Sequence, residues 1–134
     1  MEFPYLLLPG DPNNTPRPLV PVIYRHHKKE TKPILTLLDS GADYSFVTLK
    51  IASYLGIKLT GIEPVSITGF EGSSMKCFPY KTTIEIVRRT LVLPIFYGGS
   101  LTDEYPCILG QDFFFDKAKI SFKRYIWRFG IDWI

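Results

Sequence analysis

A single acidic side chain, Asp39, stands directly after a short apolar run and directly before a turn-forming pair. Residues 34–38 read Ile-Leu-Thr-Leu-Leu, which is typical of a short buried strand. Ser40 and Gly41 follow, and glycine lets the backbone turn sharply and approach other groups closely. The pattern indicates a carboxylate that is held in a fixed pose for chemistry instead of being spread into solvent.

One carboxyl group is only half of what is needed to hydrolyse an amide with carboxyl groups alone. One of the two must take a proton from water while the other, protonated, donates to the carbonyl oxygen. The chain has one Asp-Ser-Gly sequence, and the surroundings of Asp112, Asp116 and Asp132 do not repeat it. If the protein works in this way, the second carboxyl group is Asp39 of another copy, brought close across a twofold axis.

A second apolar run ends in glycine much later in the chain. Residues 37–43 read Leu-Leu-Asp-Ser-Gly-Ala-Asp, and residues 108–112 read Ile-Leu-Gly-Gln-Asp. This pair of segments resembles the retropepsin-like aspartic proteases, a family of retroviral and retrotransposon proteases, bacterial relatives and protease domains of ubiquitin-shuttle proteins. The resemblance extends from about Leu19 to Phe129. A turn with no catalytic role remains the alternative for Asp-Ser-Gly alone, because these residues favour turns anyway.

The resemblance implies an all-β fold, a small closed β-barrel of the retropepsin type with one or two short helices, that forms a homodimer. The chain's own patterns agree, since many short strand-like runs alternate with turns. Helical spacing is restricted to residues 48–55, where Thr48 is placed to cap and Gly56 to end the helix, and to a turn or two at residues 111–115. Residues 108–110 are expected to pack beneath the active turn, against Leu37 and Leu38.

The family pattern also implies roles for the residues of the turn. Asp39 is the catalytic acid, and Ser40 makes a hydrogen bond across the dimer. Gly41 offers its N–H near the carboxylates and its C=O to the substrate. Ala42 and Asp43 line the cleft as substrate-binding residues.

Residues 65–78 resemble the flap that closes over the substrate in this family. Gly69 and Gly72 supply flexibility and Phe70 lies near the tip, so these three are further expected substrate-binding residues. Glu71 and two serines stand in the tip region, where retroviral flaps are richer in glycine. An ordinary exposed hairpin is the alternative for this segment.

The ends of the chain allow two readings. Residues 1–18 form an N-terminal leader or an extra edge strand, and residues 19–134 form the protease domain. A leader of this kind pairs with its own domain or with a partner chain, because its large apolar side chains are costly to leave in water. Trp127, Trp133 and residues 131–134 are candidates to pair across the dimer, as the termini do in retroviral members.

Composition limits the partners. The formal charge is +3 with acids and bases interspersed, which is too mild for a surface that binds nucleic acid or a membrane. Cys77 and Cys107 lack metal-ligand spacing, so we expect free buried thiols, no metal and no cofactor. No apolar stretch reaches transmembrane length. These features favour a cytoplasmic protein, or one inside a viral or retroelement particle.

The sequence therefore predicts a homodimeric aspartic endopeptidase that binds a polypeptide substrate in extended conformation. Water activated by Asp39 and its symmetry mate would cleave the peptide bond. The alternative is a catalytically weak or inactive module on the same fold, which dimerises or binds peptides. A third interpretation is a monomeric β-barrel binding domain with an incidental Asp-Ser-Gly turn.

Overall fold

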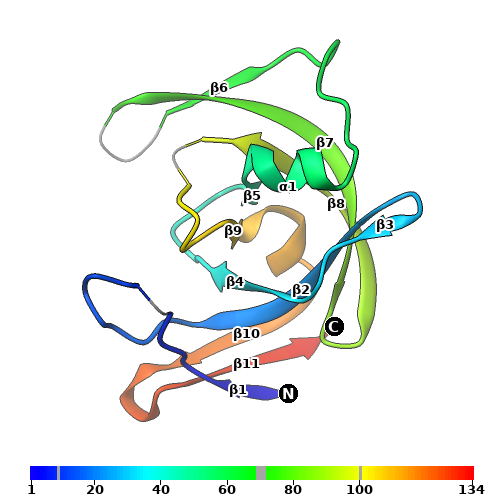
Figure 1. Ribbon diagram of the computed structural model, residues 1–134. Helices are drawn as coiled ribbons and strands as arrows, with labels where there is room; N and C mark the ends of the chain where they lie inside the picture. Colours follow the sequence, from blue (N-terminus) through cyan, green and yellow to red (C-terminus); the bar gives the residue numbers. More distant parts are fainter. Residues whose placement is uncertain (9, 69–71, 100) are drawn as a thin grey trace.

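The computed structural model describes residues 1–8, 10–68, 72–99 and 101–134. Within these residues six strands close into a barrel in the order β2–β4–β9–β5–β8–β7, because β7 also pairs with β2. The barrel strands are β2 (Leu19–His26), β4 (Ile34–Leu38), β5 (Phe46–Val47), β7 (Ser74–Ile86), β8 (Arg89–Gly98) and β9 (Cys107–Leu109). Two further strands, β3 (Lys29–Glu30) and β6 (Val65–Thr68), extend β2 and β7 (Figure 1). The predicted all-β class and closed barrel are confirmed.

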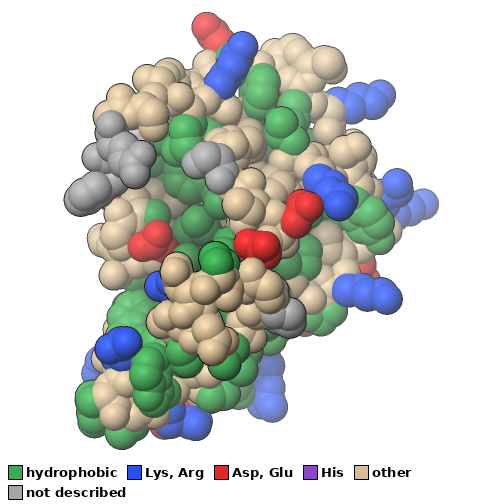
Figure 2. All heavy atoms as spheres, turned by 60° about the vertical axis from the view of Figure 1, so that its left-hand side comes forward, with side chains coloured by type: hydrophobic (Ala, Val, Ile, Leu, Met, Phe, Trp, Pro, Cys, Tyr) green, Lys and Arg blue, Asp and Glu red, His purple; other side chains and the backbone are tan. Residues whose placement is uncertain are grey.

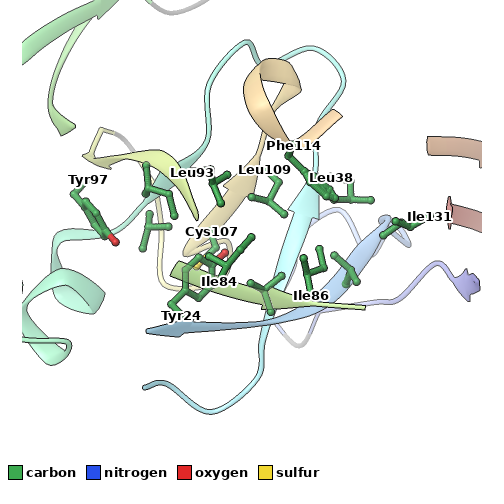
Figure 3. Packing of buried hydrophobic residues seen from close by; sticks show 14 of the residues in the cluster. Tyr24, Leu38, Ile84, Ile86, Leu93, Tyr97, Cys107, Leu109, Phe114 and Ile131 are labelled. Atoms are coloured by element: carbon green, nitrogen blue, oxygen red, sulfur yellow. The ribbon is translucent and has the colours of Figure 1, made fainter. Parts of the chain in front are cut away.

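Alternating apolar residues fill the barrel. Val20, Val22 and Tyr24 of β2 are all fully buried, with Ile84 and Ile86 of β7 beside them (Figure 3). Each such side chain contributes about 1.5–3 kcal/mol when it leaves water. The Tyr24 hydroxyl lies 2.8 Å from the Thr36 hydroxyl, so its polar end is satisfied inside the core.

A separate three-stranded sheet lies under the barrel, at the bottom of Figure 1. Its order is β1 (Glu2–Pro4), β11 (Arg128–Trp133), β10 (Ala118–Lys123), all antiparallel. Phe129 and Ile131 of β11 are buried in the main core. The chain's first strand therefore pairs with its last, and β11 has partners on both sides over residues 128–130.

Helical structure is brief. The helix α1 (Leu49–Tyr54) begins after Thr48 and ends before Gly56, whose φ is +73°. The Thr48 side chain makes no capping hydrogen bond, so the helix is held by the burial of Ala52 and the following Leu55. Two shorter turns are η1 (Gln111–Phe115) and η2 (Arg124–Ile126).

Among the described residues, no helix has the length and apolar character required to cross a membrane.

Candidate active site

Backbone hydrogen bonds hold the turn that carries Asp39. The Asp39 N–H donates to the Leu109 carbonyl over 3.0 Å, which ties the residue to β9. The Gly41 N–H donates to Oδ1 of Asp39 over 2.9 Å, and the Ala42 N–H donates to the Asp39 carbonyl over 3.2 Å. The carboxylate is half-buried at the end of β4. Its orientation is therefore set by the backbone of the two residues that follow it.

The second glycine-ended segment lies beneath this turn, as predicted. Strands β4 and β9 run parallel, with Leu37 opposite Ile108 and Leu38 opposite Leu109. Leu38 and Leu109 lie together with Phe114 in the core (Figure 3). The pairing brings the two motifs side by side although they are far apart in the sequence.

Gln111 and Asp112 clamp the backbone of the turn. The Gln111 N–H donates to the Ala42 carbonyl over 2.9 Å, and the Asp112 N–H donates to the Asp43 carbonyl over 2.8 Å. The Gln111 side-chain amide donates to the Ser40 carbonyl. These three bonds fix the backbone of residues 40–43, on which any substrate contact at this turn depends.

Ser45 is a part of this clamp that sequence reasoning missed. It is buried, and its Oγ accepts from the Gly110 N–H over 3.2 Å. Its carbonyl accepts from the Phe96 N–H over 2.9 Å, which joins the turn to β8. No local pattern marks Ser45, because both partners are distant in the chain.

The turn opens into a cleft with a volume of about 760 Å³. Asp39, Gly41, Ala42 and Asp43 line one part of it, and the whole of β6 lines another. Its remaining lining residues are Tyr44, Phe46, Met75, Phe96, Gly98, Gly99, Leu101 and Ile108. Figure 2 shows this side of the molecule, with hydrophobic side chains in a recess and acidic side chains beside it.

Not every predicted site residue reaches the cleft. Ser40 is exposed on the turn and is not among the lining residues. Gly72 is also exposed outside the lining, with a φ of +78°. The predictions for Gly69 and Phe70 fall outside the described residues.

The charged side chains among the described residues of this lining are both acidic, Asp39 and Asp43. The aromatic rings of Tyr44, Phe46 and Phe96 form a wall, with ring centroids 4.9 Å apart for Tyr44–Phe96 and 6.0 Å apart for Phe46–Phe96. A cleft with an aromatic wall and a fixed carboxylate suits a ligand that has apolar side chains and a polar group to be acted on.

Neither of the two cysteine thiols lines the cleft. Cys77 and Cys107 are both free and buried, and burial raises the pKa of each, that of Cys107 to about 12. Such thiols keep their protons at neutral pH and offer no thiolate nucleophile. Within the described part of the chain, no group of three or more His, Cys, Asp and Glu side chains is placed to hold a metal ion.

Comparison with known proteins identifies this fold. No protein-family model and no curated protein matches the chain. A crystal structure of a retropepsin-like aspartic protease from Rickettsia conorii matches with a TM-score of 0.67 and 15% identity, over 99% of this chain and 91% of that one. The EIAV protease in complex with an inhibitor matches with a TM-score of 0.56 and 25% identity, over 78% of this chain and 90% of that one. The resemblance to the retropepsin-like aspartic proteases is confirmed, and this chain has their fold.

Proposed function

We propose that this protein is a homodimeric aspartic endopeptidase with Asp39 as its catalytic residue. The observation that carries the proposal is the position of Asp39, at the end of a core strand, on a turn clamped by β9 and η1, and facing a large apolar cleft. Of the two solved structures compared above, one is a retropepsin-like aspartic protease and the other is a protease, which supports the same reaction class. The described chain brings one such carboxylate to its cleft, so a second copy must supply the other.

In this proposal a water molecule lies between Asp39 and Asp39 of the second copy. Two carboxyl groups at such close range share one proton, because like charges cannot both stay ionised. The ionised group takes a proton from the water, which attacks the peptide carbonyl, and the protonated group donates to the carbonyl oxygen. The Gly41 N–H bond to Oδ1 holds the carboxylate plane for both steps.

The substrate in this proposal is an extended peptide. It lies between β6, which belongs to the flap, and the turn of residues 39–43, with side chains in alternate pockets. The apolar walls favour hydrophobic side chains next to the bond that is cleaved. Ala42 and Asp43 contact it from the side of the turn, and Gly72 belongs to the flap that closes over it. Ser40 stiffens the paired turns by a bond across the dimer.

Digestion of a peptide library with the wild-type protein and with Asp39→Asn tests this proposal. We expect wild-type cleavage that a statine-type transition-state mimic inhibits, and no cleavage by Asp39→Asn at unchanged thermal stability. Asp103→Asn is the matched control, because it neutralises an exposed acid outside the described cleft lining. Cleavage by Asp39→Asn at the wild-type rate would show that the catalytic assignment is wrong. Peptide binding without turnover from acid to neutral pH would favour the inactive peptide-binding module.

A further inference from the structure

A second, smaller hollow lies beside the cleft. Its volume is about 70 Å³, and it is lined by Tyr44, Ser45, Pro94, Phe96, Asp112 and Phe113. Tyr44 and Phe96 line the cleft as well, so their contacting rings form a wall that the two hollows share. Tyr44 and Phe113 are exposed, which leaves the small hollow open at the surface.

Phe113 is presented to this hollow by a strained backbone. Its φ and ψ are +69° and −48°, a combination that residues with a side chain rarely adopt. Its ring is 51% exposed, whereas the ring of the next residue, Phe114, is fully buried. Strain at an exposed aromatic residue is costly, so it points to a role for that residue other than packing.

The neighbours of Phe113 hold it in this position. The Asp112 N–H is bonded to the Asp43 carbonyl over 2.8 Å on one side, and buried Phe114 anchors the chain on the other. The Phe113 N–H itself donates to Oδ2 of Asp116 over 3.2 Å. The segment that clamps the active turn therefore also fixes an aromatic ring just outside the cleft.

We propose that Tyr44, Phe96 and Phe113 form an accessory subsite for an aliphatic side chain of the peptide in the cleft, beyond the residues next to the cleaved bond. This inference rests on the proposed function, because the ligand is the peptide that the cleft takes. A hollow of about 70 Å³ that is open at the surface has room for the branched end of a Val or Leu side chain and is too small for an aromatic ring. Its aromatic and proline walls select for that side chain by apolar contact.

The test begins with a short peptide that the wild-type protein cleaves, found in a random peptide library. The peptide is extended with alanine at both ends, and each added alanine is replaced in turn by leucine. We expect one added position at which leucine raises kcat/KM about tenfold, the effect of one to two buried methylene groups. Phe113→Ala should remove that gain and leave cleavage of the short peptide unchanged.

Two further variants separate a subsite from a structural role. Phe122 lies on β10, lines neither hollow, and at 39% exposure resembles Phe113. Phe122→Ala should therefore keep the gain in kcat/KM that leucine gives. Glycine adopts a positive φ without strain, so Phe113→Gly should be at least as thermally stable as the wild type. It should nevertheless lose the gain in kcat/KM that leucine gives. If Phe113→Ala and Phe113→Gly both keep the leucine gain, the subsite is wrong.

Binding separates this inference from the proposed activity. The same peptides, carrying a fluorescent label, are bound to Asp39→Asn with and without Phe113→Ala. Tighter binding of the leucine peptide that depends on Phe113, with no cleavage by the wild-type protein, would support the subsite and overturn the proposed activity. Cleavage with no leucine effect at any added position would support the activity and overturn the subsite. No binding and no cleavage of any library peptide would overturn both.

Discussion

At Gly110 the segment beneath the active turn comes so close to its neighbours that no side chain fits. A Cβ on this residue would lie 2.6 Å from the Ala42 carbonyl oxygen and closer still to that of Tyr44. Both obstacles are backbone atoms, and moving them would break the Gln111 N–H bond to Ala42. We expect Gly110→Ala to lower the free energy of unfolding by about 3 kcal/mol, measured by urea denaturation, and to abolish peptide cleavage.

Gly61→Ala is the control for that change. Gly61, unlike Gly110, has a positive φ, +87°, but a Cβ there would have nothing within 4 Å. Gly61→Ala should then lower the free energy of unfolding only by the strain of the left-handed backbone, about 1 kcal/mol. Equal destabilisation by Gly110→Ala and Gly61→Ala would contradict the steric account of the clamp.

The buried thiol of Cys107 should make the protein less stable in alkali. Burial raises its pKa from near 9 to about 12, against the smaller lowering by hydrogen bonds with Tyr24 and Thr36. Between these two values the unfolded chain releases the proton and the folded chain keeps it, so the free energy of unfolding falls as pH rises above 9. We expect Cys107→Ala to flatten this fall in urea denaturation series from pH 7 to pH 10. An unchanged slope in that variant would mean that other groups cause the fall.

At the scale of elements, the turn between β7 and β8 is a source of strain unrelated to the site. Val87 and Arg88 have φ values of +46° and +62°, as two-residue hairpin turns require. Arg88 is exposed, so glycine there removes backbone strain without loss of packing. We expect Arg88→Gly to raise the free energy of unfolding by about 0.5–1 kcal/mol. Lys81→Gly, the same change at an exposed position inside β7, should lower it instead.

Strand β1 is attached in part by charge. Glu2 accepts from Lys123 Nζ over 2.8 Å and lies 3.5 Å from Arg128 Nε. The Lys123 hydrogen bond is the main cause of the lowered pKa of Glu2. The stabilisation is therefore present above the ordinary glutamate pKa and is lost as pH falls through the lowered value.

We expect hydrogen exchange in residues 2–6, corrected for its intrinsic rate, to be faster at pH 3 than at pH 6. Glu2→Gln should show a smaller difference between the two pH values, because only the Asp132 carboxylate, 2.9 Å from the N-terminal ammonium, is left there to protonate. The apolar contacts of β1, such as the Phe3 ring stacked 5.3 Å from that of Phe129, should keep the strand attached at both. Equal protection of wild type at pH 3 and pH 6 would show that these contacts alone hold it.

Much of this architecture could be predicted from local pattern. The apolar run before Asp39 and the run before Gly110 each have strand spacing. The family resemblance predicts that the second packs beneath the turn, and in the structure the two runs are the parallel neighbours β4 and β9. Residues 82–86 alternate between polar and apolar side chains, which predicts a strand, and they form the last part of β7, because period-two burial is a local property. The apolar residues at 120–122 and 126–129 flank Lys123-Arg124-Tyr125, which predicts a hairpin, and β10 and β11 form one with η2 in its turn.

The parts that could not be predicted depend on contacts between distant residues. Ser45 reaches Gly110, and the side-chain amide of Gln111 reaches Ser40. Ser45 belongs to no local motif, and Gln111 lies in the segment of residues 108–112, whose pattern does not show what this amide contacts. Thr48 stands where a capping residue is expected, yet its side chain makes no cap, since tertiary burial alone holds so short a helix. The backbone of Phe113 has no sequence signature either, because β-branched and aromatic residues normally avoid positive φ.

At the scale of the whole molecule, the proposed site requires two copies of the chain. Among the described residues of the cleft, Asp39 and Asp43 come from the same turn, and no second Asp-Ser-Gly turn supplies a partner for Asp39. A chain whose activity depends on pairing should lose activity when an inactive copy competes for its partner. The activity of a monomeric enzyme would not change when such an inactive copy is added.

Mixing wild-type protein with Asp39→Asn measures this dependence. With free exchange of subunits, random pairing at equal amounts leaves about half of the wild-type chains in wild-type dimers, so the cleavage rate should fall to about one half. A ninefold excess of Asp39→Asn should leave about one tenth of the wild-type cleavage rate. The mixed dimer is inactive because it has a single Asp39 carboxyl group and no second one with which to share a proton. Asp103→Asn, added in the same amounts, should not reduce the rate. A rate that Asp39→Asn leaves unchanged, with sedimentation at the mass of one chain, would show that one copy of Asp39 acts alone.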